Sequence, residues 1–138
     1  MSIFDGLFKK KQVELDDPVF GHLTFDHGVW TSIPTPPTSG FMITVAAPEV
    51  GPTAEQRSFF QHIRSLLPDL QKQARDYMQS RVDQSVDVSR LSVYSVEIGS
   101  VEETGRREFV LELSDEDVIV IHRVSFRADE PVDYGFDD

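Results

Sequence analysis

The longest regular pattern in the chain is an apolar stripe in its middle. Between residues 53 and 80, apolar side chains recur at steps of three and four, the period of one face of an α-helix. Thr53 and Gln56 have the spacing of a capping box, which opens a helix. The stripe comprises Phe59, Phe60, Ile63, Leu66, Leu67, Leu70, Ala74, Tyr77 and Met78. This pattern predicts one long helix with a kink or short break at Pro68, because proline removes a backbone donor from the helix interior.

Period-two alternation of apolar and polar residues predicts strands on both sides of this helix. Three strands are expected before the helix and three after it, and short turns within each triplet favour antiparallel meanders. The expected strands cover residues 19–25, 29–33, 41–46, 91–98, 108–113 and 118–127, and 99–106 is interpreted as a polar loop. The predicted fold class is α+β: an antiparallel sheet of about six strands packed against one long helix.

The length of 138 residues suits a single domain. We expect the α+β domain to span residues 16–128, between an N-terminal tail at 1–15 and an acidic C-terminal tail at 129–138. The N-terminal tail carries apolar residues at helical spacing ahead of three lysines, a pattern that also suits a short amphipathic anchor. These apolar residues are Ile3, Phe4, Leu7 and Phe8.

Composition narrows the classes of function. The chain has no cysteine, so disulfides, thiolate nucleophiles and cysteine-based metal sites are excluded. Its net charge of −11 argues against binding nucleic acid through phosphates, which needs clustered positive charge. No segment reaches the roughly 18–20 apolar residues of a membrane span, and the N-terminus lacks the order of a secretory signal. A cytoplasmic protein is expected.

Candidate catalytic chemistry is sparse. No G-x-S-x-G elbow and no glycine-rich phosphate loop occurs in the sequence. His22 and His27 flank a turn beside Asp26, and such a set is one alternative for a divalent metal. Their spacing is not that of a helical metal motif, so turn chemistry is the preferred interpretation. His62 is expected on the solvated helix face and His122 in the core. No enzyme activity and no cofactor is predicted.

Candidate binding residues cluster in the acidic last third of the chain, where a basic partner protein would find charge complementarity. Tyr134 and Phe136 interleave with these acids as a docking tail would. Trp30, the single tryptophan, is a further candidate anchor, with packing in the sheet as the alternative. The acidic candidates are Asp115, Glu116, Asp117 and Asp133.

Three short patterns together resemble a group of small bacterial domains of unknown function. They are Asp17-Pro-Val-Phe-Gly-His-Leu23, then Gly28-Val-Trp30, then Thr53-Ala-Glu-Gln56 at the start of the helix. The resemblance covers residues 16–80 and concerns structural motifs. It implies an α+β domain with no known reaction, and some similar acidic proteins are suspected immunity proteins.

The sequence therefore favours a non-enzymatic protein-binding domain of immunity or antitoxin type that blocks a basic partner. One alternative is an accessory module that docks through the N-terminal segment with Ile3 and Phe8. Another is a metal-dependent hydrolase that uses His22 and His27.

Overall fold

The computed structural model describes residues 12–32 and 40–137 of the chain. Within these residues the strands are β1 (Val13–Asp17), β2 (Gly21–Asp26), β3 (Val29–Ser32), β4 (Met42–Ala46), β5 (Ser92–Ile98), β6 (Glu108–Asp115), β7 (Val118–Arg127) and β8 (Glu130–Asp137). The helical segments are α2 (Ala54–Gln79), the 3₁₀ turn η1 (Val88–Arg90) and α3 (Val101–Gly105). All eight strands belong to one sheet.

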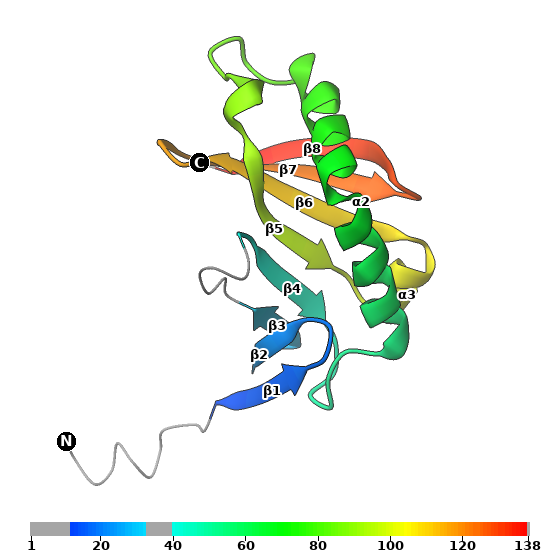
Figure 1. Ribbon diagram of the computed structural model, residues 1–138. Helices are drawn as coiled ribbons and strands as arrows, with labels where there is room; N and C mark the ends of the chain where they lie inside the picture. The colour runs from blue at the N-terminus through cyan, green and yellow to red at the C-terminus, as the bar shows by residue number, and fades with distance from the viewer. Residues whose placement is uncertain (1–11, 33–39, 138) are drawn as a thin grey trace, which may run out of the picture.

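The strands follow one another across the sheet in chain order, from β1 at one edge to β8 at the other. Every neighbouring pair is antiparallel except β4 and β5, which are parallel. A parallel pair needs a long connection, and α2 supplies it. The helix lies across one face of the sheet and joins two four-stranded antiparallel halves (Figure 1).

The predicted long helix is confirmed at almost its expected length. Thr53 caps its N-terminus, and the side chains of Thr53 and Gln56 bond each other's backbone as a capping box. Of the two alternatives expected at Pro68, a kink or a short break, the break does not occur: the helix runs through this residue to Gln79. Pro68 lies on the exposed side, where water can satisfy the carbonyl that the ring leaves without a partner.

The apolar stripe of α2 builds the core against the sheet. Leu70, Ala74 and Met78 are fully buried, and the Phe59 ring meets Phe109 of β6 edge-on with 5.7 Å between centroids. Phe109 in turn stacks on Phe126 of β7 at 4.8 Å. The predicted packing of the helix across the sheet is therefore present.

The sheet of the described residues has eight strands where six were expected. Strand β1 begins in the segment interpreted as an N-terminal tail, residues 1–15, and β8 occupies the expected C-terminal tail. Strand β8 pairs with β7 along most of its length, so residues 130–137 are part of the domain. The expected polar loop at 99–106 contains α3, which Ser100 and Glu103 open with a capping box.

The residues that carry the family resemblance have structural roles. The Asp17 side chain accepts backbone N–H bonds from Val19 and Phe20 and pairs with Arg57 of α2 at 2.8 Å. Burial alone would raise the pKa of Asp17, but these donors together hold it below its ordinary value. Phe20 packs on Phe60 with centroids 5.0 Å apart. The turn formed by Asp17 to Phe20 thus connects the β1–β2 end of the sheet to α2.

Gln56 closes the parallel crossover from inside. Its side-chain amide is fully buried and donates to the backbone carbonyls of Ala46 and Gly99, at 2.8 and 2.9 Å. Ala46 is the last residue of β4 and Gly99 directly follows β5, so one side chain joins the ends of both parallel strands to the helix. Such a buried amide is tolerated because all its polar atoms find partners.

No helix in the described part of the chain is long and apolar enough to cross a lipid bilayer. The N-terminal segment with Ile3, Phe4, Leu7 and Phe8 lies outside the described residues.

Candidate functional site

The pleat of the sheet separates a face covered by α2 from a face that points away from it, here called the open face. Paired residues on the covered face form an apolar row across five strands. This row consists of Trp30, Val45, Ile98, Phe109 and Phe126, each at most 3% exposed. The next row lies on the open face and consists of Thr24, Thr31, Thr44, Glu97, Val110, Ser125 and Asp133. The residues shift from apolar to mainly polar between adjacent rows.

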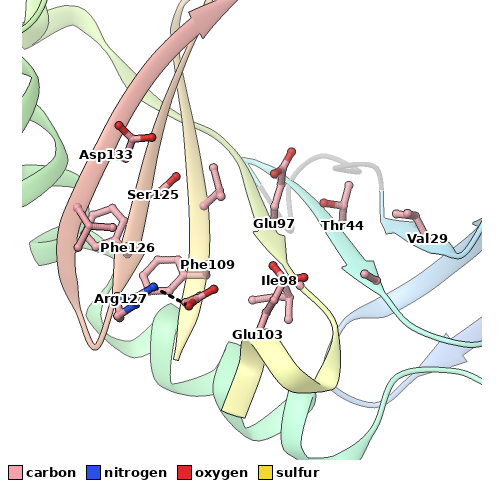
Figure 2. Close-up of a pocket in the computed structure, with 15 residues that line it drawn as sticks. Val29, Thr44, Glu97, Ile98, Glu103, Phe109, Ser125, Phe126, Arg127 and Asp133 are labelled. Carbon is pink, nitrogen blue, oxygen red and sulfur yellow. Dashed lines mark hydrogen bonds and ion pairs between the residues drawn. The ribbon is translucent and has the colours of Figure 1, made fainter. Parts of the chain in front are cut away.

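The open face is hollowed into a cleft of about 540 Å³ over strands β3 to β8. Figure 2 shows Asp133, Ser125, Glu97, Thr44 and Val29 in succession along it, each on a different strand. Its lining mixes these polar side chains with apolar ones. No strand or helix of the described residues covers this side of the sheet (Figure 1).

An ion-pair network occupies the centre of the open face. Arg123 of β7 donates to both carboxylate oxygens of Glu97, at 2.7 and 3.0 Å, and to Glu112 at 2.8 Å. The hydroxyl of Ser95 donates to the other oxygen of Glu112 at 2.5 Å. A bidentate arginine–carboxylate pair has a defined geometry, so these side chains are held in place before any partner arrives.

A further carboxylate, that of Glu108, also lines the cleft. Its Oε1 atom accepts from Arg106 and from Arg127, both at 2.9 Å. The hydrogen bond from Arg106 is the main cause that lowers the pKa of Glu108. Both arginines of the open face, Arg123 and Arg127, are therefore paired with glutamates.

The two edges of the open face carry less compensated acid. On β1 and β2, His22 lies between Asp16 at 2.8 Å and Glu14 at 3.3 Å, and the hydrogen bond with Asp16 is the main cause that raises the pKa of His22. On β8, neither Asp133 nor Asp137 has an ion-pair partner among the described residues. The open face therefore has a neutralised centre and acidic edges.

Charge is divided unequally between sheet and helix. The eight strands contain 11 acidic residues against two arginines, whereas α2 contains three acidic and four basic residues. Lys9, Lys10 and Lys11 supply three of the 13 basic residues of the chain and lie outside the described part. The acidity of this domain thus belongs to its strands.

The predicted acidic turn does not line the cleft of the open face. Asp115 and Asp117 both pair with Arg90, at 3.3 and 2.5 Å, and Glu116 between them is exposed. Two of these three carboxylates are therefore already engaged within the chain. Salt bridges this exposed contribute little to stability, so the turn is a weaker binding candidate than the unpaired acids of β8.

The structure divides the predicted docking tail between the two faces of β8. Asp133 lies on the open face, whereas Tyr134 and Phe136 lie on the covered side beside His122. The Tyr134 hydroxyl is 2.7 Å from Nδ1 of His122, and Phe136 remains 60% exposed. Burial raises the pKa of Tyr134 and lowers that of His122, so His122 is a core histidine whose partner is a side chain.

Trp30 lies in the core. It is 1% exposed, packs against Phe25 at 4.9 Å and donates its indole N–H to the Pro48 carbonyl at 2.9 Å. Trp30 therefore packs in the core, as the alternative interpretation expected, and its side chain is not accessible to a partner.

The two histidines considered for a metal occupy separate settings. His27 is in a hairpin turn with φ 49° and pairs with Asp26, while His22 lies on β2 with Asp16 and Glu14. The described residues contain no group of three or more histidine or acidic side chains arranged to hold a metal ion. A metal-dependent hydrolase therefore gains no support from this geometry.

His62, expected on a solvated face, fastens α2 to the β7–β8 turn. Its Nε2 atom is 2.9 Å from Asp129, and Arg107 also reaches Asp129 at 3.2 Å. Arg107 and Asp129 both have positive φ, at 57° and 66°, so local contacts hold them in an unfavourable backbone region. We interpret the contacts among His62, Arg107 and Asp129 as structural, because they connect α2 to the β7–β8 turn.

The central network was missed by reasoning from sequence. Its members Glu97, Glu112 and Arg123 lie on three strands, and only the strand register brings them together. The available signal was an arginine on the polar side of a strand predicted to be half-buried. Such a residue usually needs a carboxylate partner on a neighbouring strand.

Comparison with known proteins found no match among protein-family models, curated proteins or solved structures. The resemblance to small bacterial domains therefore stays a prediction that rests on the residues that carry it.

Proposed function

We propose that this domain is a non-catalytic protein-binding module that engages a basic partner with the open face of its sheet. The observation that carries the proposal is the uncovered face itself, on the sheet whose strands hold 11 acidic residues against two arginines. An uncovered sheet face with a cleft offers both a contact area and a recess for partner side chains.

The arrangement of charge suits this role. The paired centre around Arg123 needs little reorganisation on binding, because its side chains are already hydrogen-bonded to each other. The unpaired acids at the edges, such as Asp133, would attract a basic partner during approach. In this arrangement the ordered centre would orient the partner, and the charged rim would attract it.

The immunity or antitoxin class is the more specific form of this proposal. It draws on the resemblance in residues 16–80 and on the acidity of the chain. An inhibitor of this class needs a rigid surface and no catalytic group, and the hydrogen-bonded side chains at the centre of the open face support this role.

The absence of cysteine permits a direct test of the face. Two variants, Ser125→Cys in the cleft and Ser65→Cys on the exposed side of α2, each accept one bulky maleimide label. With a partner captured from the native cell, we expect the label at position 125 to abolish binding and the label at position 65 to leave it intact. Binding that survives the label at position 125 but not at position 65 would transfer the site to the helix.

A further inference from the structure

Strand β8 closes the sheet at one edge. Its inner side pairs with β7 from Glu130 to Asp137, and no strand follows it in the sheet order of the described residues. In an edge strand, alternate residues direct their N–H and C=O groups outward. Among the described residues, none of these groups takes part in a turn, loop or cap hydrogen bond. The edge is therefore available to another extended chain.

The side chains of this edge are unusually apolar for an exposed surface. Val132 is 52% exposed and Phe136 60% exposed, and they are two of only five large apolar residues exposed in the described part of the chain. Val132 borders the cleft of the open face, at a bulge opposite Ser125 and Phe126. Phe136 lies on the covered side, with its ring 6.4 Å from that of Tyr134. An added strand would find an apolar contact on each face of β8.

The charges on β8 discriminate between possible occupants. Asp133 and Asp137 have no ion-pair partner among the described residues, and Glu130 has none either. Pairing with a second copy would bring these acids together in a chain of net charge −11. Acidic side chains on an edge strand are a common guard against such self-association. The same acids favour a strand that carries lysine or arginine.

The opposite edge of the sheet is less suited to this role. Strand β1 has five residues, and Asp17 at its end is buried and bonded to Arg57. Its other acids, Glu14 and Asp16, flank His22, and it exposes no large apolar side chain. The two edges thus differ in length, in free acid and in apolar exposure.

We propose that β8 receives an extended, basic segment of the partner as an additional strand of the sheet. Main-chain hydrogen bonds to the outer edge of β8 would supply affinity, as in other cases of strand addition. Apolar side chains of the added strand would contact Phe136 on the covered side, and its basic side chains would meet Asp133 and Asp137 on the open face. This inference rests on the proposed function for the charge of the partner, and it adds the element and the mode of contact.

The test uses the full chain and a defined probe, a peptide of alternating lysine and valine. A second peptide of the same sequence and charge is N-methylated at its two central residues, one of which has to direct its N–H towards β8, so it cannot complete a ladder of hydrogen bonds. We expect the first peptide to slow amide exchange at alternate residues of β8 by about tenfold or more, and the N-methylated peptide to leave exchange unchanged. Equal effects of both peptides would show that charge alone is recognised and would overturn the proposal.

Two variants distinguish binding at the β8 edge from nonspecific binding to exposed apolar side chains. Phe136→Ser removes the exposed apolar contact of β8, and Val101→Ser removes a similarly exposed side chain from α3. We expect the first variant to weaken peptide binding about five- to tenfold and the second to have no effect, as loss of one apolar contact predicts. Equal weakening by both variants would contradict the inference.

The outcomes also distinguish this inference from the proposed function. Peptide-induced changes centred on Glu97 and Arg123, with no protection of β8 amides, would overturn strand addition and leave the open face as the binding site. Loss of partner binding on labelling position 65, rather than 125, would instead overturn the proposed function.

Discussion

The two faces of the sheet are built from the same strands but differ in burial and in the polarity of their side chains. On the covered face, Phe109, Leu111 and Val124 are almost completely buried under α2. On the open face, their immediate neighbours Val110, Glu112 and Ser125 remain partly exposed, and Glu112 forms an ion pair with Arg123. Because neighbouring residues in a strand point to opposite faces, each strand contributes apolar side chains to the core and mainly polar side chains to the open face.

The two faces are expected to contribute unequally to stability and, under the proposed function, to binding. Burial of apolar area on the covered face is the main source of folding free energy. Partly exposed ion pairs, such as Arg123 with Glu97, contribute far less. We therefore expect substitutions on the covered face to change the free energy of unfolding, and those on the open face to change binding.

The largest expected effect is the loss of a core side chain of α2. Leu70→Ala should lower the free energy of unfolding by about 2–5 kcal/mol, because Leu70 is fully buried and its removal leaves a cavity. Leu66→Ala is the matched control, since Leu66 is on the same helix but only partly buried, and its cost should be smaller. Denaturant unfolding compares the two. Equal costs would contradict the assignment of the buried stripe.

A smaller effect is expected at the turn that fastens β1 to the helix. Asp17→Asn should cost about 1.5–3 kcal/mol at pH 7, because it removes the charged partner of Arg57. The pKa of Asp17 is lowered in the folded protein, so its contribution is present above about pH 4 and is lost as the pH falls through the folded pKa. The stability gap between wild type and variant should therefore narrow in acid.

Urea unfolding at neutral and at acidic pH measures this gap. Asp76→Asn, on the exposed side of α2, is the control and should behave as wild type at both pH values. A gap for Asp17→Asn that stays constant in acid would show that the carboxylate contributes through shape and not through charge.

The elements that sequence reasoning found are those with strong local patterns. The 26-residue α2 and the long alternation of β7 each carry enough apolar residues to be recognised without tertiary information. The spacing of Thr53 and Gln56 also located the helix start within one residue. In these elements, local preference and global packing agree.

The elements that it missed have weak or misleading local patterns. Strand β8 contains Pro131, Gly135 and three acids, a composition typical of tails, and only its pairing with β7 stabilises it as a strand. In β1, only Val13 and Leu15 signal the alternation. The open face was missed for a related reason, since its ion pairs depend on the register between strands and no sequence spacing encodes register.

A still smaller effect on stability, but a clear one on binding, is expected at the centre of the open face. Arg123→Met should lower the free energy of unfolding by less than about 1 kcal/mol, because the ion pairs it removes are partly exposed. It should speed dissociation of the captured partner, since Glu97 and Glu112 lose their fixed geometry.

Arg90→Met provides the control for this prediction, because Arg90 forms comparable ion pairs with Asp115 and Asp117, and none of these three residues lines the cleft. The dissociation rate of the partner from each variant is measured by surface-binding kinetics, and only Arg123→Met is expected to raise it. Similar dissociation for both variants and wild type would exclude the Arg123 network from the interface.

Recognition by the open face is tested most directly by comparing two double charge reversals in partner binding. Asp16→Lys with Asp133→Lys alters both edges of the open face, and Asp69→Lys with Asp76→Lys makes the same change of net charge on the outer side of α2. At low ionic strength we predict that the open-face pair slows association by about tenfold or more while the helix pair changes it little. Equal slowing by both pairs would show that net charge alone attracts the partner, and it would contradict the assignment of recognition to the open face.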